Sequence, residues 1–258
     1  MVGIESKHLG KVAVLYGGTS AERDISLMSG KHVLQGLQDA GVDAHGIDVG
    51  DDIVQVLQAG QFDRVFNVLH GRGGEDGTIQ ALLEFLNIPY CGSGVAASSL
   101  SMDKARTKWV WQANDLPTPD FCLVKQEADI LNLPGHFTYP LAVKPLHEGS
   151  SLGMSKVKCE SELLPAFHTA KQYHDEVMVE RWIEGGEYTV GIIGDTILPS
   201  VKISTPREFY DYEAKYFVNT TQYDCPSDLD KTAESQIANL ARQAFDVLGC
   251  KDWARIDF

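Results

Sequence analysis

The stretch at residues 143–157, VKPLHEGSSLGMSKV, decides how the second half of the chain is organised. It places Lys144 at the end of an apolar strand, residues 137–144, and a glycine- and serine-rich loop before the next strand, residues 153–157. The loop offers free backbone N–H groups, two hydroxyls and one ammonium group, which together suit a triphosphate. An ordinary hairpin is the alternative, but it gives no reason for Lys144 to end an apolar strand.

Downstream of this loop the sequence keeps the pattern of paired strands, which indicates an α+β region. Extended segments are expected at residues 177–182, 188–193 and 197–203. Helices are expected at residues 160–173 and 227–248, and the second of these has one apolar face.

The first hundred residues alternate strands with helices, the pattern of a parallel sheet with crossover helices. This region predicts strands at residues 12–16, 42–49 and 63–69, helices at 25–40, 53–57 and 78–86, and a fourth strand beginning at 89–91. Residues 95–114 are expected to form one long helix that ends before Pro117 and Pro119. The fold class is therefore α/β followed by α+β.

Composition excludes several classes of protein. With 43% apolar residues among 258, the chain has material for cores and is not disordered or fibrous. Its formal charge of -14 predicts no nucleic-acid or membrane partner, so any phosphate must be bound locally in a cleft. Five widely spaced cysteines indicate reduced thiols in a soluble, cytoplasmic protein. Neither a Walker P-loop nor a GxGxxG motif is present.

Two glycine-rich turns in the first half follow strands, where an α/β sheet usually places its ligands. In residues 17–23, GGTSAER, a tight turn carries Glu22 into a helix. This carboxylate either binds a substrate ammonium group or caps the helix, and the segment alone favours neither. In residues 70–77, HGRGGEDG, four glycines imply close backbone approach. His70, Glu75 and Asp76 favour a functional loop over a plain turn.

Three later segments combine polar side chains with strand ends or aromatic residues. Residues 180–187, ERWIEGGE, place acceptors beside an apolar strand; they suit adenine and ribose, although surface salt bridges explain the same residues. Residues 208–217, EFYDYEAKYF, are typical of a loop that closes over ligands. In residues 253–258, WARIDF, Arg255 and Asp257 share one strand face, where they either bind an oxyanion and Mg2+ or neutralise each other.

Eight motifs together resemble those of the D-alanine–D-alanine ligases, members of the ATP-grasp superfamily. They occur in the family's order and span nearly the whole chain: GGTSAER, HGRGGEDGT, MDKARTK, VKPLHEGSSLGMSKV, ERWIEGGEYTV, YDYEAKY, YDCPSDL and ARIDF. The resemblance implies a Rossmann-like N-terminal domain at residues 1–103 and an ATP-grasp fold of two α+β subdomains at 104–187 and 188–258. The last subdomain is expected to be incomplete, because the family's closing strand, with a Glu and an Asn for Mg2+, would follow Phe258.

The resemblance also implies an activity, the joining of two D-alanines at the expense of ATP through an acyl phosphate, for peptidoglycan precursors. Its implied cofactors are ATP and Mg2+ or Mn2+, and Asp257 is the implied metal ligand. The implied ATP-binding residues are Lys104, Lys144, Ser150, Ser151, Met154, Glu180, Trp182, Ile183, Glu187 and Lys215.

For the substrates, the resemblance implies that Glu22 binds the first ammonium group with His70 nearby. Lys215 would meet the transferred phosphoryl group and the second carboxylate, and Arg255 would stabilise the oxyanion. Glu22, Ser150 and Tyr216 would form a hydrogen-bonded set that closes the loop. Tyr216 favours dipeptide synthesis, because members that make the D-lactate ester tend to carry Phe there. A homodimer is also implied.

Two alternatives stay open at this point. In the first alternative, the chain is a different ATP-grasp carboxylate-amine ligase, and Glu22, His70 and Tyr216 lose the roles given above. In the second alternative, the chain is a nucleotide- or amino-acid-binding module, or an inactive fragment.

Overall fold

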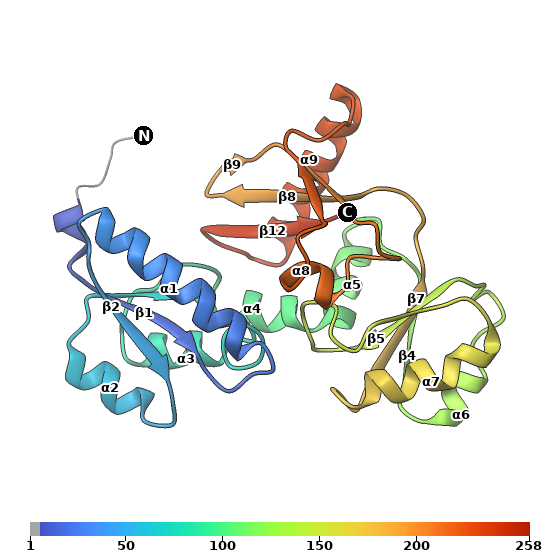
Figure 1. The fold of residues 1–258 in the computed structure, drawn as a ribbon, viewed down its shortest axis with the longest axis horizontal. Helices are drawn as coiled ribbons and strands as arrows, with labels where there is room; N and C mark the ends of the chain where they lie inside the picture. Colours follow the sequence, from blue (N-terminus) through green and yellow to red (C-terminus); the bar gives the residue numbers. More distant parts are fainter. Residues whose placement is uncertain (1–5) are drawn as a thin grey trace. The chain divides into compact units, whose positions relative to one another are not determined.

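The computed structural model describes residues 6–258 and divides into two compact units (Figure 1). The first unit runs to Ser99 and includes Cys250–Asp252; the second contains Leu100–Gly249 and Trp253–Phe258. Across the described residues, no helix combines the length and apolar character that a bilayer span requires. The five cysteines all carry free thiols.

The first unit is built on a parallel sheet of order β2-β1-β3, which confirms the predicted fold class for this half. Its elements are η1 (Ser6–Leu9), β1 (Lys11–Gly17), α1 (Arg23–Asp39), β2 (Asp43–Val49), α2 (Ile53–Gly60), β3 (Arg64–Asn67), α3 (Thr78–Phe85) and the first part of α4 (Val95–Met102).

Helices cover both faces of this sheet because β1 is apolar at every interior position. Successive side chains of a strand point to opposite faces. Val12 and Val14 therefore pack with the apolar residues of α1, which lies along β1 and β2 (Figure 1). Ala13 and Leu15 pack on the opposite side against residues of α2 and α3. Burial on both faces explains the unbroken apolar run in the sequence.

The second unit begins with an antiparallel sheet of order β4-β7-β5-β6, called here the central sheet. Its α6 and α7 share an apolar core with one face, and residues of α5 pack on the other. The elements are α5 (Lys104–Ala113), β4 (Phe121–Val124), α6 (Glu127–Leu131), β5 (Leu141–Pro145), β6 (Ser155–Val157), α7 (Glu160–Lys171) and β7 (Val177–Arg181).

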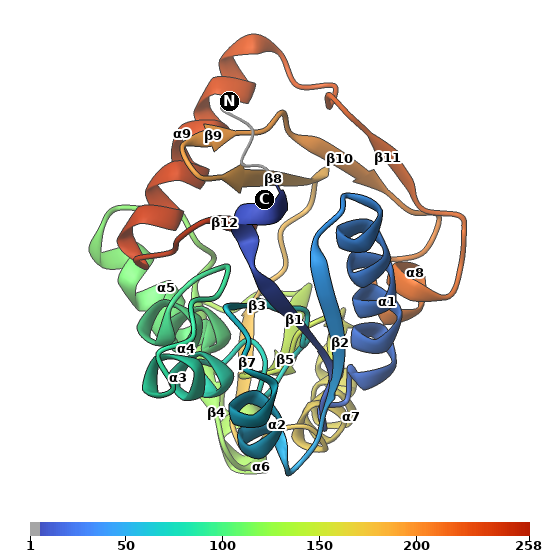
Figure 2. The same ribbon diagram turned by 90° about the vertical axis from the view of Figure 1, so that its left-hand side faces the viewer.

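A second antiparallel sheet, the C-terminal sheet, has the order β11-β10-β8-β12, with β9 beside β8. Figure 2 shows α9 alongside this sheet, and α9 contacts β8 and β12. The elements are β8 (Glu187–Ile193), β9 (Thr196–Ile197), β10 (Val201–Ser204), α8 (Tyr212–Tyr216), β11 (Gln222–Asp224), α9 (Lys231–Val247) and β12 (Trp253–Asp257).

Two sequence-based expectations were wrong in detail. The single helix expected at residues 95–114 is two helices, because Asp103 adopts an extended conformation and its side chain accepts a hydrogen bond from the backbone N–H of Arg106. That cap starts α5 as a new helix. The fourth strand expected from residue 89 is only an isolated parallel bridge between Val65 and Tyr90.

The core under α7 generates a stability prediction. Phe167→Ala should lower the free energy of unfolding by about 3–5 kcal/mol, because Phe167 is 2% exposed within the apolar core of the central sheet. The neighbouring His168→Ala should change it by less than about 0.5 kcal/mol, since that side chain is 53% exposed. Urea unfolding of both variants provides the measurement; equal losses would contradict the core assignment.

Candidate active site

Helix α5 brings two lysines to one face of the central sheet. Lys104 and Lys108 lie four residues apart, so their side chains leave the same side of the helix. Lys104 Nζ donates to the carbonyl oxygens of Pro145 and Leu146 at 3.1 and 3.0 Å, and also to that of Glu148. The ammonium group therefore sits at the start of the glycine- and serine-rich loop.

Glu180 lies between two ammonium groups on the same sheet face. It stands opposite Ala142 on β5, and Lys144 follows two residues later on that face. One carboxylate oxygen is bound by Lys144, and the other is 2.8 Å from Lys108 Nζ. Only 11% of the Glu180 side chain is exposed, so this pairing offsets the cost of burying its charge.

The pKa values of Glu180 and Lys104 are shifted by burial and by the neighbouring charges. Burial opposes ionisation of Glu180, but the ammonium groups of Lys144 and Lys108 outweigh it and lower the pKa of Glu180 below 4.5. Burial, with a contribution from Lys144, lowers the pKa of Lys104 to about 7. Two ammonium groups on one carboxylate, with the Lys104 amine at the start of the neighbouring loop, make this face suited to an additional anion.

The loop that follows Lys144 contains left-handed backbone. Ser150 and Ser151 have φ values of +51° and +59°, which cost non-glycine residues roughly 1–2 kcal/mol each. The Ser150 and Tyr216 hydroxyl groups are hydrogen-bonded at 2.7 Å, and Ser151 Oγ donates to the Tyr210 carbonyl at 3.2 Å. The segment around α8 thus holds the loop, and two of the three predicted loop-closing residues are brought together.

Two of the residues predicted to surround adenosine, Trp182 and Ile183, lie near the segment that holds the Ser150–Ser151 loop. Trp182 packs edge-on against Phe209 at 5.6 Å between ring centroids, and Lys156 Nζ lies 4.6 Å from the Trp182 ring. Ile183 is 56% exposed, an apolar surface open to a ligand. Met154 closes the loop's last turn, with its N–H donating to the Ser151 carbonyl at 3.3 Å.

Glu187, Arg255 and Asp257 lie on one face of the C-terminal sheet. The register pairs Asp257 with Thr189 and Arg255 with Gly191, and alternation adds Glu187 to the same face. Arg255 Nε is 3.1 Å from Asp257 Oδ1, and Thr189 Oγ1 donates to the same oxygen at 2.8 Å. Burial raises the pKa of Glu187; Lys215 acts against the rise and Asp257 adds to it.

The acidic groups of this face do not by themselves form a metal-binding cluster. Within residues 6–258, no group of three or more His, Cys, Asp or Glu side chains is arranged to hold a metal ion. Asp257 alone still fits Mg2+ that is carried by substrate phosphates, because such Mg2+ usually takes one or two protein carboxylates. The alternative role, neutralising Arg255, is also present in the structure.

Glu22 and His70 lie together in the first unit. Glu22 is 2% exposed and precedes α1, but its side chain makes no capping hydrogen bond, so the alternative of a helix cap is wrong. A Cβ atom at Gly71, where φ is +66°, would be 2.8 Å from Glu22 Oε2, which explains the glycine there. Burial lowers the pKa of His70, and Glu22 opposes that change.

Two acidic residues of the 70–77 loop have structural roles. The Glu75 carboxylate accepts from the Gly71 N–H at 2.7 Å, and Asp76 accepts from the N–H groups of Gly73 and Thr78 at 2.9 and 3.0 Å. These bonds fix the loop that carries His70.

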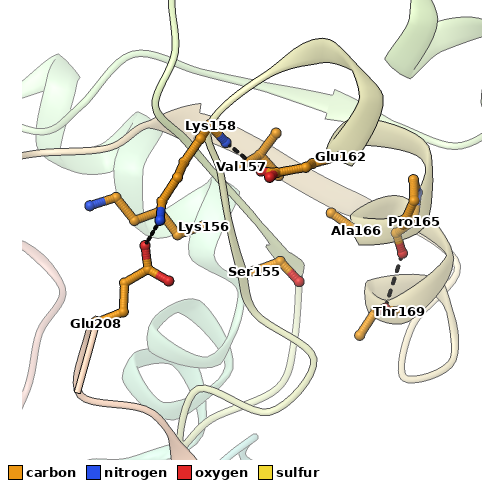
Figure 3. A pocket seen from close by; sticks show the side chains of 9 residues that line it. All are labelled: Ser155, Lys156, Val157, Lys158, Glu162, Pro165, Ala166, Thr169 and Glu208. Atoms are coloured by element: carbon orange, nitrogen blue, oxygen red, sulfur yellow. Dashed lines mark hydrogen bonds and ion pairs between the residues drawn. The ribbon is translucent and has the colours of Figure 1, made fainter.

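A shallow pocket of about 270 Å³ lies in the second unit between β6, α7 and Glu208, and Lys156 is one of its lining residues (Figure 3). Its rim includes the ion pair of Lys158 with Glu208 at 2.5 Å. None of the individually predicted site residues lines it.

The sequence did not single out Lys108, Phe209 or Tyr210 as site residues, although the last two lie in the predicted ligand-closing segment 208–217. A signal for Lys108 was available: it lies one helical turn after Lys104, on the same side of α5. The contacts of Phe209 and Tyr210 depend on how a loop folds back, which local patterns do not encode.

The Glu180 ion pairs generate a second stability prediction. Glu180→Gln should cost about 3 kcal/mol at pH 7, because it leaves buried Lys108 without its counter-charge. Since the pKa of Glu180 is lowered in the folded state, the loss should be full above pH about 5 and shrink as the pH falls through that pKa. Glu176→Gln, which removes the partner of the exposed Lys125, should cost less than about 1 kcal/mol. Urea titrations across pH test this; a pH-independent loss would contradict it.

Comparison with known proteins gives a consistent result. The families described as "D-ala D-ala ligase N-terminus" and "D-ala D-ala ligase C-terminus" match residues 50–93 and 110–258. A D-alanine–D-alanine ligase of Pseudomonas fluorescens is 51% identical, over 98% of this chain and 78% of that protein. D-alanine–D-alanine ligase B of Pseudomonas syringae pv. tomato is 52% identical, over 98% of this chain and 80% of that protein.

A crystal structure of D-alanine–D-alanine ligase from Bacillus anthracis aligns with a TM-score of 0.82 at 30% identity, covering 96% of this chain and 82% of that one. The same enzyme complexed with ATP gives a TM-score of 0.81 at 27% identity, covering 96% and 81%. With a model match over more than half its length and relatives near 50% identity, the chain belongs to the D-alanine–D-alanine ligase family.

Proposed function

We propose that the chain joins two D-alanines into D-alanyl-D-alanine at the expense of ATP, which is converted to ADP and phosphate, for peptidoglycan synthesis. The observation that carries the proposal is the gathering of Lys104, Lys108 and Lys144 around Glu180, beside the Ser150–Ser151 turn. In a chain with a net charge of -14, such a cluster indicates a local site for a polyanion.

In the nucleotide site, Lys104 and Lys144 bind phosphate oxygens, and the loop from Ser150 to Met154 folds over them. Glu180, Trp182, Ile183 and Glu187 surround adenosine. The exposed apolar surface of Ile183 and the Trp182–Phe209 packing support a site for an adenine ring.

The reaction has two displacements. A carboxylate oxygen of the first D-alanine attacks the γ-phosphorus of ATP, ADP leaves, and an acyl phosphate forms. The amine of the second D-alanine then attacks the acyl carbon, the amine loses a proton, and phosphate leaves. The protein's contribution is positioning and charge neutralisation.

Each remaining predicted residue has a role in these steps. Glu22, with His70 nearby, binds the first ammonium group. Lys215 binds the transferred phosphoryl group and the second carboxylate, and Arg255 stabilises the tetrahedral oxyanion. Asp257 would be the ligand from this chain to Mg2+ (or Mn2+), which would neutralise phosphate charge when bound. The homodimer that the resemblance implies and the cytoplasmic location that the cysteines indicate remain predictions.

A phosphate-release assay with D-alanine, L-alanine or no amino acid tests the function. D-alanine-dependent release is expected, and Lys144→Met should lower kcat/KM at least about 100-fold because a phosphate-binding charge is lost. Lys125→Met, which changes an exposed lysine that is paired with Glu176, should stay within about twofold of the original protein. Equal release with every amino acid would favour another ATP-grasp ligase, and nucleotide binding without release would favour a binding module.

The Tyr216 hydroxyl should control the choice of second substrate. Tyr216→Phe removes the hydroxyl that is bonded to Ser150, and the ratio of kcat/KM for D-lactate to that for D-alanine should rise about tenfold or more. Tyr223→Phe, which removes an exposed hydroxyl bonded to Tyr210, is the matched control. An unchanged ratio in Tyr216→Phe would rule out this role.

A further inference from the structure

Lys108 is a buried member of the lysine cluster to which the proposed reaction gives no contact with a substrate. Its side chain is 7% exposed, and its Nζ atom is bonded to Glu180 Oε2 at 2.8 Å and to Thr118 Oγ1 at 2.7 Å. The same ammonium group lies 5.2 Å from the centroid of the Phe121 ring. These neighbours fix its position between α5 and the central sheet.

The two lysines that share Glu180 differ in what they can reach. Lys144 is 20% exposed and directly precedes the Ser150–Ser151 loop, so a nucleotide phosphate can approach it. Lys108 lies between α5, β4 and β7, is 7% exposed, and has its amine bonded to Glu180 and Thr118. The Lys144 ammonium group can therefore exchange Glu180 for another anion, whereas the Lys108 ammonium group stays with Glu180.

This difference matters when an anion arrives. If Lys144 leaves Glu180 to bind a phosphate oxygen, the buried carboxylate keeps a counter-charge only because Lys108 remains. Without Lys108, Lys144 would be the only ammonium group bonded to Glu180, and its transfer would leave a buried charge unpaired. Phosphate binding would then become less favourable.

We propose that Lys108 is a positioning residue of the nucleotide site, the fixed counter-ion of Glu180 that allows Lys144 to transfer its ammonium group to a phosphate of ATP. The inference rests on the proposed function and gives Lys108 a role of its own within it.

The test compares Lys108→Met, Glu180→Gln, the double variant and the control Lys125→Met. Lys125 forms a surface pair with Glu176 at 2.7 Å, so its loss removes a Lys–Glu pair of similar geometry away from the site. Calorimetric titration with ATP and Mg2+, and separately with inorganic tripolyphosphate, is carried out at a temperature where circular dichroism shows every variant folded.

Lys108→Met should bind ATP and tripolyphosphate at least tenfold more weakly, and KM for ATP should rise more than kcat falls. Glu180→Gln should bind tripolyphosphate at least as tightly as the original protein, because Lys144 is released from the carboxylate. The double variant should match Glu180→Gln within twofold, and Lys125→Met should match the original protein. Purely structural damage would weaken tripolyphosphate binding in all three site variants.

Unchanged ATP and tripolyphosphate binding in Lys108→Met would overturn the role of Lys108 while leaving the proposed function intact. So would a double variant that binds tripolyphosphate as weakly as Lys108→Met. Failure of the original protein to bind either ATP or tripolyphosphate would overturn both.

Discussion

The buried carboxylate of Glu180 is the constraint on which the second unit's arrangement depends. A charge removed from water needs partners, and here Lys108 comes from α5 and Lys144 from β5. The ion pairs attach α5 to the central sheet at the same place where the helix delivers Lys104 to the carbonyl groups at residues 145–148. One set of charges thus holds the helix on the sheet and assembles the phosphate-binding face.

The neighbouring Ser150–Ser151 loop has an unfavourable backbone conformation that contacts from residues distant in the sequence stabilise. Left-handed Ser150 and Ser151 are unfavourable alone, and their hydroxyl groups are bonded to Tyr216 and to the Tyr210 carbonyl. The aromatic segment around α8 therefore contacts the loop that the proposed nucleotide would lie under. On the C-terminal sheet, strand alternation is enough to align Glu187, Arg255 and Asp257.

Features with a local cause could be predicted from the sequence. The apolar run of β1 predicts a strand buried on both faces, and the alternation in WARID predicts that Arg255 and Asp257 share a face. The break at Asp103 was missed, because an N-cap inside a helix-favouring segment depends on a single side chain. The Lys108–Glu180 pair joins residues 72 positions apart, so only tertiary packing brings them together. For Glu22, the structure removed the capping alternative that the sequence left open.

A crystal structure of the protein with Mg2+ and a non-hydrolysable ATP analogue tests the central claim most directly. We expect the Lys144 Nζ atom to lie within about 3 Å of a phosphate oxygen, with Lys108 still bonded to Glu180 and the Ser150–Ser151 turn over the phosphates. A nucleotide bound away from this face, with Lys144 still paired to Glu180, would contradict the account.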